Sequence, residues 1–326
     1  MNKKELEISG ELMNPISSIK KKARGLNKRI IFPEGEDERI QKAAKKAAKE
    51  KIAEPILITP KVIEKSEKLK KYAKEYSKKF KVSNETAMSI IKHPLFYSAM
   101  AVKLGDADGM IGGCVYTSGD FIAVCKQVIG LQKGVSVPSS FFLMSIPNCE
   151  FGEEGNFIYS DASVNPNPTE KELADIAVVS GETAKTLFNW KPKVAILSFS
   201  TKGSAEHPDV CKVINATKIA QKKAKKGIAI DGELQADSAV IQSVAKKKIK
   251  GKTGSVAGQA NVLIFPDLDA ANISYKLTQR LAKADAYGPI LQGFAKPVSD
   301  LSRGATVKDI YGVIAMLCVW SKRWKK

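Results

Sequence analysis

The sequence predicts an α/β protein made of two doubly wound domains, each with a mainly parallel sheet. One observation is length, because 326 residues exceed a usual single domain and favour two. The other is a regular alternation of short apolar runs with amphipathic ones. Residues 29–32 are predicted as a strand, residues 38–51 as a helix with one apolar face, and residues 55–59 as the next strand. This order is typical of a parallel βαβ unit.

The alternation continues along the chain. Short apolar stretches predict strands at residues 109–113, 139–144, 157–161, 194–199, 228–231, 261–266 and 288–293. Helical periodicity predicts helices at residues 61–81, 173–188, 208–226 and 270–283, and residues 246–252 are predicted as a basic loop. Open parallel sheets bind ligands at the carboxyl ends of their strands, so the loops that follow strands are the candidate sites.

One turn-rich stretch, residues 147–156, is the best single candidate for a domain boundary. A return crossing is expected near residues 289–297. Composition alone does not place the boundary more closely.

The chain is strongly basic, with a formal net charge of +19. A nucleic-acid-binding protein is one interpretation of this charge. However, only six of the 53 basic residues are arginine, at positions 24, 29, 39, 280, 303 and 323. Base-edge recognition favours arginine forks, and no nucleic-acid-binding motif is recognisable. Scattered lysine is more typical of a solvated surface, although a positive field also attracts polyanionic ligands. We therefore predict no nucleic-acid partner.

Cysteine and histidine are too sparse for redox or metal chemistry of the usual kinds. The five cysteines, at 114, 125, 149, 211 and 318, form no CxxC pair, and the only histidines are His93 and His207. We therefore predict neither a disulfide framework nor a metal site. The chain contains no run of 18 apolar residues, and residues 1–12 mix charged with apolar side chains. Neither a membrane span nor a signal peptide is predicted, so we expect a cytoplasmic protein without a membrane partner.

The densest motif lies in residues 261–309, where a strand, a helix, a second strand and a polar turn follow one another closely. The turn, Asp300-Leu301-Ser302-Arg303-Gly304, places a hydroxyl beside a guanidinium. Because arginine is scarce in this chain, its position here is informative. A planar guanidinium grips phosphate through two parallel hydrogen bonds, which lysine cannot do.

Two other polar loops are candidates for substrate binding. Thr117 and Ser118 follow the strand at 109–113, where hydroxyls and amides are placed to meet a phosphate, although Thr117 also suits a helix N-cap. Ser200, Thr201 and Lys202 follow the strand at 194–199 and are predicted to contact substrate; the alternative is a solvated βα loop. The glycines of residues 105–113 match neither the dinucleotide-binding spacing nor the P-loop spacing.

Seven motifs in order give the chain a resemblance to the phosphate acetyl/butyryltransferase family. They are IFPEGEDER (31–39), GDADGM (105–110), SSFFLM (139–144), VNPNPT (164–169), LSFSTKGSA (197–205), DGELQ (231–235) and DLSRG (300–304). The resemblance implies a fold like that of the isocitrate/isopropylmalate dehydrogenases. It also implies one domain from residues 1–147 plus 296–326, a second from residues 148–295, an active-site cleft between the two domains, and a homodimer.

The resemblance further implies reversible acetyl transfer between coenzyme A and inorganic phosphate through acetyl phosphate, without a permanently bound cofactor. At the matching positions, Asp309 would take the thiol proton, Arg303 would hold the acyl phosphate, and Ser302 would hydrogen-bond the sulfur or the oxyanion. Transfer would be direct, in a ternary complex. Gly293 completes the candidate substrate-binding residues. A second interpretation of Asp309 is structural, because with Thr306 it has the spacing of a helix-capping pair.

Three positions depart from the family pattern. Ser77 and Ala123 stand where relatives commonly carry arginine, and Lys78, Lys79 or Lys126 are the candidate replacements. Ala162 stands where relatives often carry cysteine, so no nucleophile is available there. Two alternatives stay open: an enzyme that prefers butyryl phosphate, and a basic protein that binds coenzyme A or nucleic acid without catalysis.

Overall fold

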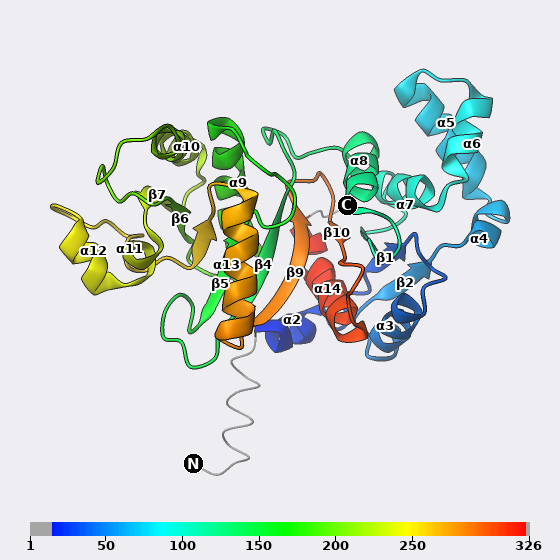
Figure 1. The fold of residues 1–326 in the computed structure, drawn as a ribbon. Coiled ribbons are helices and arrows are strands. Elements are labelled where there is room, and N and C mark those ends of the chain that lie inside the picture. Colours follow the sequence, from blue (N-terminus) through cyan, green and yellow to red (C-terminus); the bar gives the residue numbers. More distant parts are fainter. Residues whose placement is uncertain (1–14, 324–326) are drawn as a thin grey trace, which may run out of the picture. The chain divides into compact units, whose positions relative to one another are not determined.

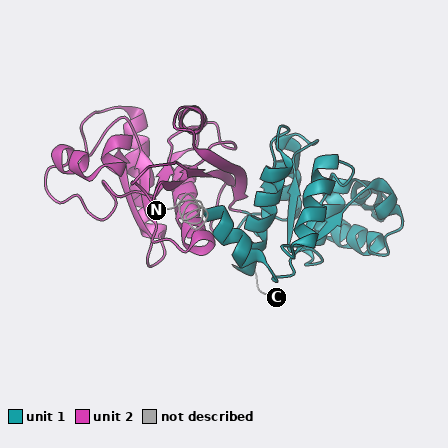
Figure 2. Ribbon diagram, turned by 90° about the horizontal axis from the view of Figure 1, so that it is seen from below, with its two compact units in different colours: residues 1–132, 294–326 teal, residues 133–293 magenta. Residues whose placement is uncertain are grey.

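The computed structural model describes residues 15–323 of the chain (Figure 1). The described residues form two compact units, residues 15–132 with 294–323 and residues 133–293 (Figure 2). The prediction that residues 1–12 are not a signal peptide lies outside the described residues. No helix within residues 15–323 combines the length and apolarity needed to cross a bilayer.

Unit 1 contains a four-stranded parallel sheet in the order β10-β3-β1-β2. Its strands are β1 (Arg29–Phe32), β2 (Glu54–Leu57), β3 (Gly109–Gly112) and β10 (Val298–Asp300). Its helices are α2 (Pro15–Ala23), α3 (Glu38–Lys49), α4 (Pro60–Glu64), α5 (Lys68–Phe80), α6 (Asn84–Ile91), α7 (Pro94–Lys103), α8 (Ser118–Val128), α14 (Val307–Trp320) and the short η2 (Ser321–Arg323).

Helices cover both faces of this sheet. Every residue of β3 and β10 is buried, which a strand achieves only when neither face meets water. Helix α14 packs against α2, α3 and the strands β1, β3 and β10, while α7 and α8 pack against each other. The small alanine side chains on one side of α3 let this helix pack closely against its neighbours. Ile40, Ala43, Ala44 and Ala47 are all buried. The predicted doubly wound architecture is confirmed here.

Unit 2 contains a six-stranded sheet in the order β7-β6-β8-β5-β4-β9. Strands β7, β6, β8 and β5 are parallel, and β4 runs antiparallel to both β5 and β9. The strands are β4 (Ser139–Ser145), β5 (Asn156–Ser160), β6 (Lys193–Leu197), β7 (Ala229–Leu234), β8 (Val262–Ile264) and β9 (Asp285–Gln292). The helices are α9 (Glu170–Thr183) with the π-helical η1 (Ala184–Phe188), α10 (Pro208–Lys223), α11 (Ala236–Val240), α12 (Gln242–Lys248) and α13 (Leu268–Leu281).

The second compact unit, residues 133–293, begins and ends at other residues than the predicted second domain, residues 148–295, and the larger difference is at the first boundary. We predicted a crossing at the turn-rich stretch 147–156, but β4, which precedes it, pairs with β5 and β9 of unit 2. The stretch is therefore the connection of an antiparallel pair. Hairpin turns and linkers are rich in the same residue types, so composition alone does not separate them.

Three local predictions also need correction. The lysine-rich helix expected at 61–81 is two helices, because α4 ends at Glu64 and α5 begins at Lys68. Residues 242–248, partly predicted as a basic loop, form α12. Strand β10 was not predicted; at three residues it is too short to show a period.

Candidate active site

Three loops of unit 1 leave the same edge of its sheet. Because β1, β3 and β10 are parallel neighbours, their carboxyl ends lie together. Residues 33–37 follow β1, residues 113–117 follow β3, and residues 301–306 follow β10. This edge is where an open α/β sheet is expected to bind its ligand, and it carries the predicted Ser302, Arg303 and Thr117.

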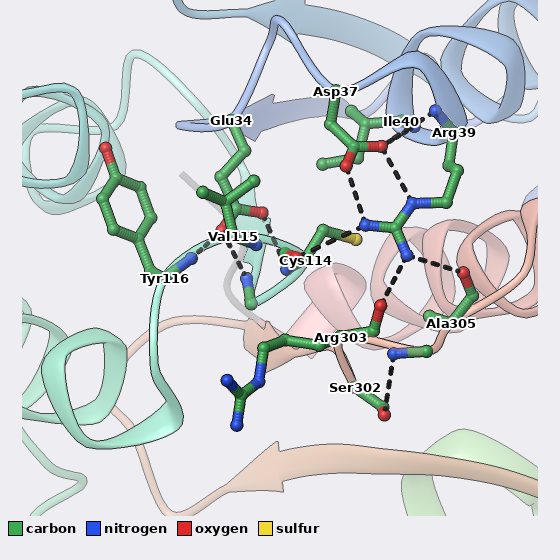
Figure 3. Close-up of polar contacts among 12 residues, drawn as sticks. Glu34, Asp37, Arg39, Ile40, Cys114, Val115, Tyr116, Ser302, Arg303 and Ala305 are labelled. Carbon is green, nitrogen blue, oxygen red and sulfur yellow. Dashed lines mark hydrogen bonds and ion pairs between the residues drawn. The ribbon is translucent and has the colours of Figure 1, made fainter.

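Glu34 holds the loop after β3. Its buried carboxylate accepts hydrogen bonds from four consecutive backbone N–H groups, those of Gly113 (3.1 Å), Cys114 (2.9 Å), Val115 (2.8 Å) and Tyr116 (2.7 Å) (Figure 3). A carboxylate is acceptor-only, and four donors satisfy both of its oxygens. The loop therefore has a fixed backbone.

Arg39 connects the three loops. Its guanidinium donates to both oxygens of Asp37, at 3.2 Å and 2.7 Å, and to the carbonyl of Cys114 at 3.3 Å. It also donates to the carbonyls of Arg303 at 2.6 Å and Ala305 at 3.3 Å (Figure 3). The hydrogen bond from Arg39 is the largest reason that the pKa of Asp37 lies below its usual value. The pair is therefore ionised at neutral pH.

Ser302 and Arg303 are exposed on the turn after β10. The Ser302 hydroxyl accepts a hydrogen bond from the N–H of Gly304 at 3.2 Å and donates to no group among the described residues. Among residues 15–323, no carboxylate or carbonyl pairs with the Arg303 guanidinium, which extends away from Arg39 in Figure 3. The turn thus presents a free guanidinium beside a hydroxyl.

Asp309 has the predicted capping geometry at the start of α14. Its Oδ2 accepts from the Thr306 N–H at 2.9 Å and from the Thr306 hydroxyl at 2.7 Å, and its own N–H donates to the Thr306 hydroxyl. This is a reciprocal capping box, so the structural interpretation of Asp309 is confirmed. Both bonds use Oδ2, which leaves Oδ1 without a partner among the described residues. The cap therefore does not prevent Asp309 from accepting a proton.

Thr117 and Ser118 begin α8. The Thr117 hydroxyl caps the helix: it donates to the Asp120 carboxylate at 2.7 Å and accepts from the Asp120 N–H at 3.2 Å. The Ser118 hydroxyl lowers the pKa of Asp300, the last residue of β10. Thr117 thus has a structural partner at the edge where substrate binding was predicted.

Asp300 is a buried carboxyl that the sequence analysis gave no role. It is 4% exposed, and its Oδ1 has no hydrogen-bond partner among the described residues. Gly113 makes room for it, since a Cβ there would collide with Oδ1 and with the backbone of Leu301, and its φ of +103° also favours glycine. Burial raises the pKa of Asp300 to about 6; the Ser118 hydroxyl opposes this rise in the pKa, and the negative charge of Glu34 adds to it.

The raised pKa of Asp300 predicts a pH-dependent stability. Because the folded value of about 6 exceeds the unfolded value of 3.8, the folded state binds this proton more tightly. The stabilisation from this proton is complete below the unfolded pKa and is lost as the pH rises through 6. Its loss lowers the free energy of unfolding by on the order of 3 kcal/mol. The non-titrating variant Asp300→Asn should therefore gain stability relative to the native protein between pH 4 and pH 7. Urea unfolding across this range measures the difference, and a pH-independent difference would contradict the prediction.

Cys114 does not supply a nucleophile for acyl transfer. It is buried, and burial together with the nearby Glu34 carboxylate raises the pKa of its thiol to about 12. Ala162, at the position where relatives often carry cysteine, is also buried. Neither position favours an acyl-enzyme.

The candidates in unit 2 are occupied by internal contacts. Ser200 and Thr201 are buried, and their hydroxyls bond Glu233 at 3.2 Å and Gln235 at 3.1 Å. The Lys202 ammonium pairs with Asp231 at 2.5 Å. We therefore leave the two hydroxyls out of the proposed site. Sequence reasoning identified the polar loop and a strand at 228–231, but not the contacts between the loop and the acidic residues of that strand, β7.

Gly293 is explained by backbone geometry. Its φ is +86°, and a Cβ there would lie 3.2 Å from the carbonyl of Val137. This position is the last residue of unit 2 before the chain returns to unit 1. Backbone geometry therefore favours glycine there whether or not substrate approaches.

The structure shows the surroundings of two positions that depart from the family pattern. The Ser77 hydroxyl donates to the carbonyl of Val82 at 2.6 Å, and Ala123 is exposed on α8. Lys79, one proposed replacement for a missing arginine, donates to the carbonyls of Gln127 and Val128 at 3.0 Å and 2.8 Å. It therefore stabilises the end of α8, which leaves Lys78 and Lys126 as exposed cations in this region.

Sequence reasoning quoted the motifs that contain Glu34, Arg39 and Asp300 but assigned these residues no function. A usable signal was the rarity of arginine, since Arg39 is one of six. Apart from Asp37, by contrast, the acceptors of Arg39 lie 75 to 266 residues away, and the donors to Glu34 lie 79 to 82 residues away. No spacing rule reaches that far.

Comparison with known proteins agrees with this description. Residues 15–318 match the model of a family described as phosphate acetyl/butaryl transferase. The phosphate acetyltransferase of Thermoanaerobacterium thermosaccharolyticum is 47% identical over 328 residues, covering 94% of this chain and 99% of the relative. That of Clostridium acetobutylicum is 45% identical, covering 95% and 99%. The crystal structure of a phosphotransacetylase from Streptococcus pyogenes shares 37% identity, with a TM-score of 0.87 over 95% of this chain and 98% of its own. The chain therefore belongs to the phosphate acetyl/butaryl transferase family.

Proposed function

We propose that this chain is an acyltransferase that moves an acetyl group reversibly between coenzyme A and inorganic phosphate. Acetyl phosphate and coenzyme A react in one direction, and acetyl-CoA and phosphate in the other. The support is family membership, together with relatives named phosphate acetyltransferase that match along almost their whole length. Coenzyme A is then a substrate, not a bound cofactor.

The observation that carries the site assignment is the free guanidinium of Arg303 beside the exposed hydroxyl of Ser302. Both stand at the carboxyl end of a parallel strand, on a turn whose backbone is held by Arg39. A guanidinium without a protein partner keeps its forked donors available for two phosphate oxygens. We therefore assign Arg303 to the phosphate of acetyl phosphate.

The proposed chemistry needs three groups. Asp309 accepts the thiol proton of coenzyme A through its unpaired Oδ1. The thiolate attacks the acetyl carbonyl, a C–S bond forms, and the Ser302 hydroxyl donates to the sulfur or to the oxyanion of the tetrahedral intermediate. The intermediate collapses, the C–O bond to phosphate breaks, and phosphate leaves with the electron pair on the oxygens held by Arg303.

Transfer is proposed to be direct, because the thiol of Cys114 is buried and protonated and Ala162 provides no nucleophile. Both substrates must then bind before any product leaves. Initial-rate plots at several fixed concentrations of the second substrate should intersect. Thioester formation, followed by ultraviolet absorbance, measures these rates. Parallel lines together with a trapped acetyl-enzyme would contradict direct transfer.

The same assay with acetyl, propionyl and butyryl phosphate tests the acyl group. We expect acetyl phosphate to give the highest kcat/KM. A preference for butyryl phosphate would assign the chain to the other acyl class of the family, and no turnover with any of the three would refute the proposed function.

We also propose a homodimer, supported by an exposed apolar stripe on α13. Ile273, Leu277 and Leu281 are 57%, 52% and 78% exposed and follow one another at intervals of four, so they share one helix face. Large contiguous apolar patches on soluble proteins commonly mark interfaces. Light scattering after gel filtration should give the mass of two chains, and Leu277→Glu should lower it to one. A native monomer, or a dimer that persists in this variant, would reject the assignment of this face.

A further inference from the structure

Arg39 uses every donor that its side chain has. A guanidinium carries five N–H groups, and five acceptors lie within reach: two oxygens of Asp37 and the carbonyls of Cys114, Arg303 and Ala305. The acceptors belong to the loops after β1, β3 and β10. One side chain therefore links all three loops of the candidate site (Figure 3).

The Asp37 side of this arrangement is rigid. Asp37 is the N-cap of α3 and accepts hydrogen bonds from the N–H groups of Arg39 at 2.8 Å and Ile40 at 3.2 Å. Its carboxylate is thereby fixed to the end of a helix, and its fork-to-fork pairing fixes the plane of the guanidinium. The Cys114 carbonyl belongs to the loop that Glu34 holds through four N–H groups.

Between its two ends, the turn that carries Arg303 has little else to orient it. Leu301 and Ala305 are buried, but residues 302–304 between them are exposed. The hydrogen bonds from Ala305 N–H to the Ser302 carbonyl at 2.8 Å and from Gly304 N–H to the Ser302 hydroxyl at 3.2 Å are internal to the turn. They shape the turn without fixing its direction. The bond from Leu301 N–H to the Gly112 carbonyl, at 2.6 Å, anchors only its first residue.

We propose that Arg39 is a positioning residue for acyl transfer: by holding the carbonyls of Arg303 and Ala305 against the cap of α3 and the loop after β3, it directs the Ser302 hydroxyl and the Arg303 guanidinium toward the substrate. This inference rests on the roles proposed above for Ser302 and Arg303. Lysine cannot take its place, because the three donors of lysine radiate from one nitrogen and cannot serve five acceptors.

Arg29 provides a matched control in the same unit. Its guanidinium also bonds a carboxylate, Asp108 at 3.2 Å, and a carbonyl, Gly105 at 2.8 Å, and its side chain is 29% exposed against 33% for Arg39. Arg29 begins β1, whereas Arg39 follows the end of that strand, so Arg29 lies at the opposite edge of the sheet. Arg29→Lys therefore reproduces the structural cost without touching the candidate site.

The experiment compares kcat, KM and melting temperature for Arg39→Lys and Arg29→Lys, after native turnover of acetyl phosphate has been shown. We expect Arg39→Lys to lose at least about 30-fold in kcat while its melting temperature falls no further than that of Arg29→Lys. An Arg39→Lys kcat within threefold of that of Arg29→Lys would overturn the inference. Absence of turnover in the native protein would instead reject the proposed function.

A double variant tests whether Arg39 acts through the turn. Once Arg303 is lysine, the direction of the turn matters less, so Arg39→Lys should cost much less in the Arg303→Lys background than alone. If the losses of kcat from the two single variants multiply in the double variant, the positioning role is wrong. If Arg39→Lys does not fold, Asp37→Asn replaces it, since asparagine remains a good N-cap but has only one oxygen to accept from the two guanidinium nitrogens. The same limits on kcat then apply.

Discussion

Replacing Arg303 with lysine should remove most acetyl transfer and leave the fold intact. Its side chain has no hydrogen-bond or ion-pair partner in the described part of the chain, so the replacement breaks no such contact. Lysine keeps the charge but offers one nitrogen where guanidinium offers a planar fork. Loss of bidentate phosphate contact should lower kcat/KM by at least tenfold, which corresponds to about 1.4 kcal/mol of transition-state stabilisation.

The control for this change is again Arg29→Lys, because it removes a guanidinium of unit 1 that does have internal partners. Arg303→Lys should lose more activity than this control while melting at a higher temperature. If its turnover stays within about threefold of the native rate, Arg303 does not anchor the acyl phosphate.

Replacing Asp309 with asparagine should lower kcat by about 100-fold or more, the usual range for loss of a general base. Asparagine keeps the shape and can still accept the Thr306 N–H through its amide oxygen, so the capping box is only weakened. Damage to a cap costs about 1 kcal/mol of stability. The two interpretations of Asp309 therefore predict different results: a large loss of kcat for the base, and a small loss of melting temperature alone for the cap.

A second capping box in this chain provides a control for the capping role of Asp309. Glu172, at the start of α9, accepts from the N–H and the hydroxyl of Thr169, each at 2.9 Å, in the same arrangement as Asp309 with Thr306. Glu172→Gln should lower the melting temperature about as much as Asp309→Asn, with kcat unchanged. Equal and small effects of both variants on kcat would leave Asp309 as a cap only.

The residual rate of Asp309→Asn should rise with pH. Without a base, reaction depends on coenzyme A that is already ionised, and free thiolate accumulates as the pH approaches a thiol pKa near 8.5. A flat profile would show that proton removal is not what the variant lacks.

Much of the fold follows from local sequence patterns. The strand at 29–32 has the predicted bounds, and α3 begins at the predicted Glu38 because Asp37 caps it. Both capping boxes were visible as a threonine followed three residues later by an acidic residue. These features depend on neighbours within one helical turn, which is the range over which a sequence can be interpreted without its fold.

The sequence by itself determined the alternation of strands and helices, the turn that carries Ser302 and Arg303, and the family. Only the tertiary structure decided which loops meet. Arg39 reaches a carbonyl 264 residues away, Glu34 binds a loop about 80 residues away, and the strand before the turn-rich stretch 147–156 belongs to unit 2. The same holds for Ser200 and Thr201, whose hydroxyls are satisfied by β7 and the residues after it. Local propensity is set by adjacent side chains. These contacts depend instead on which distant backbone groups the folded chain brings together, and each buried polar group hydrogen-bonds the partner that lies beside it there.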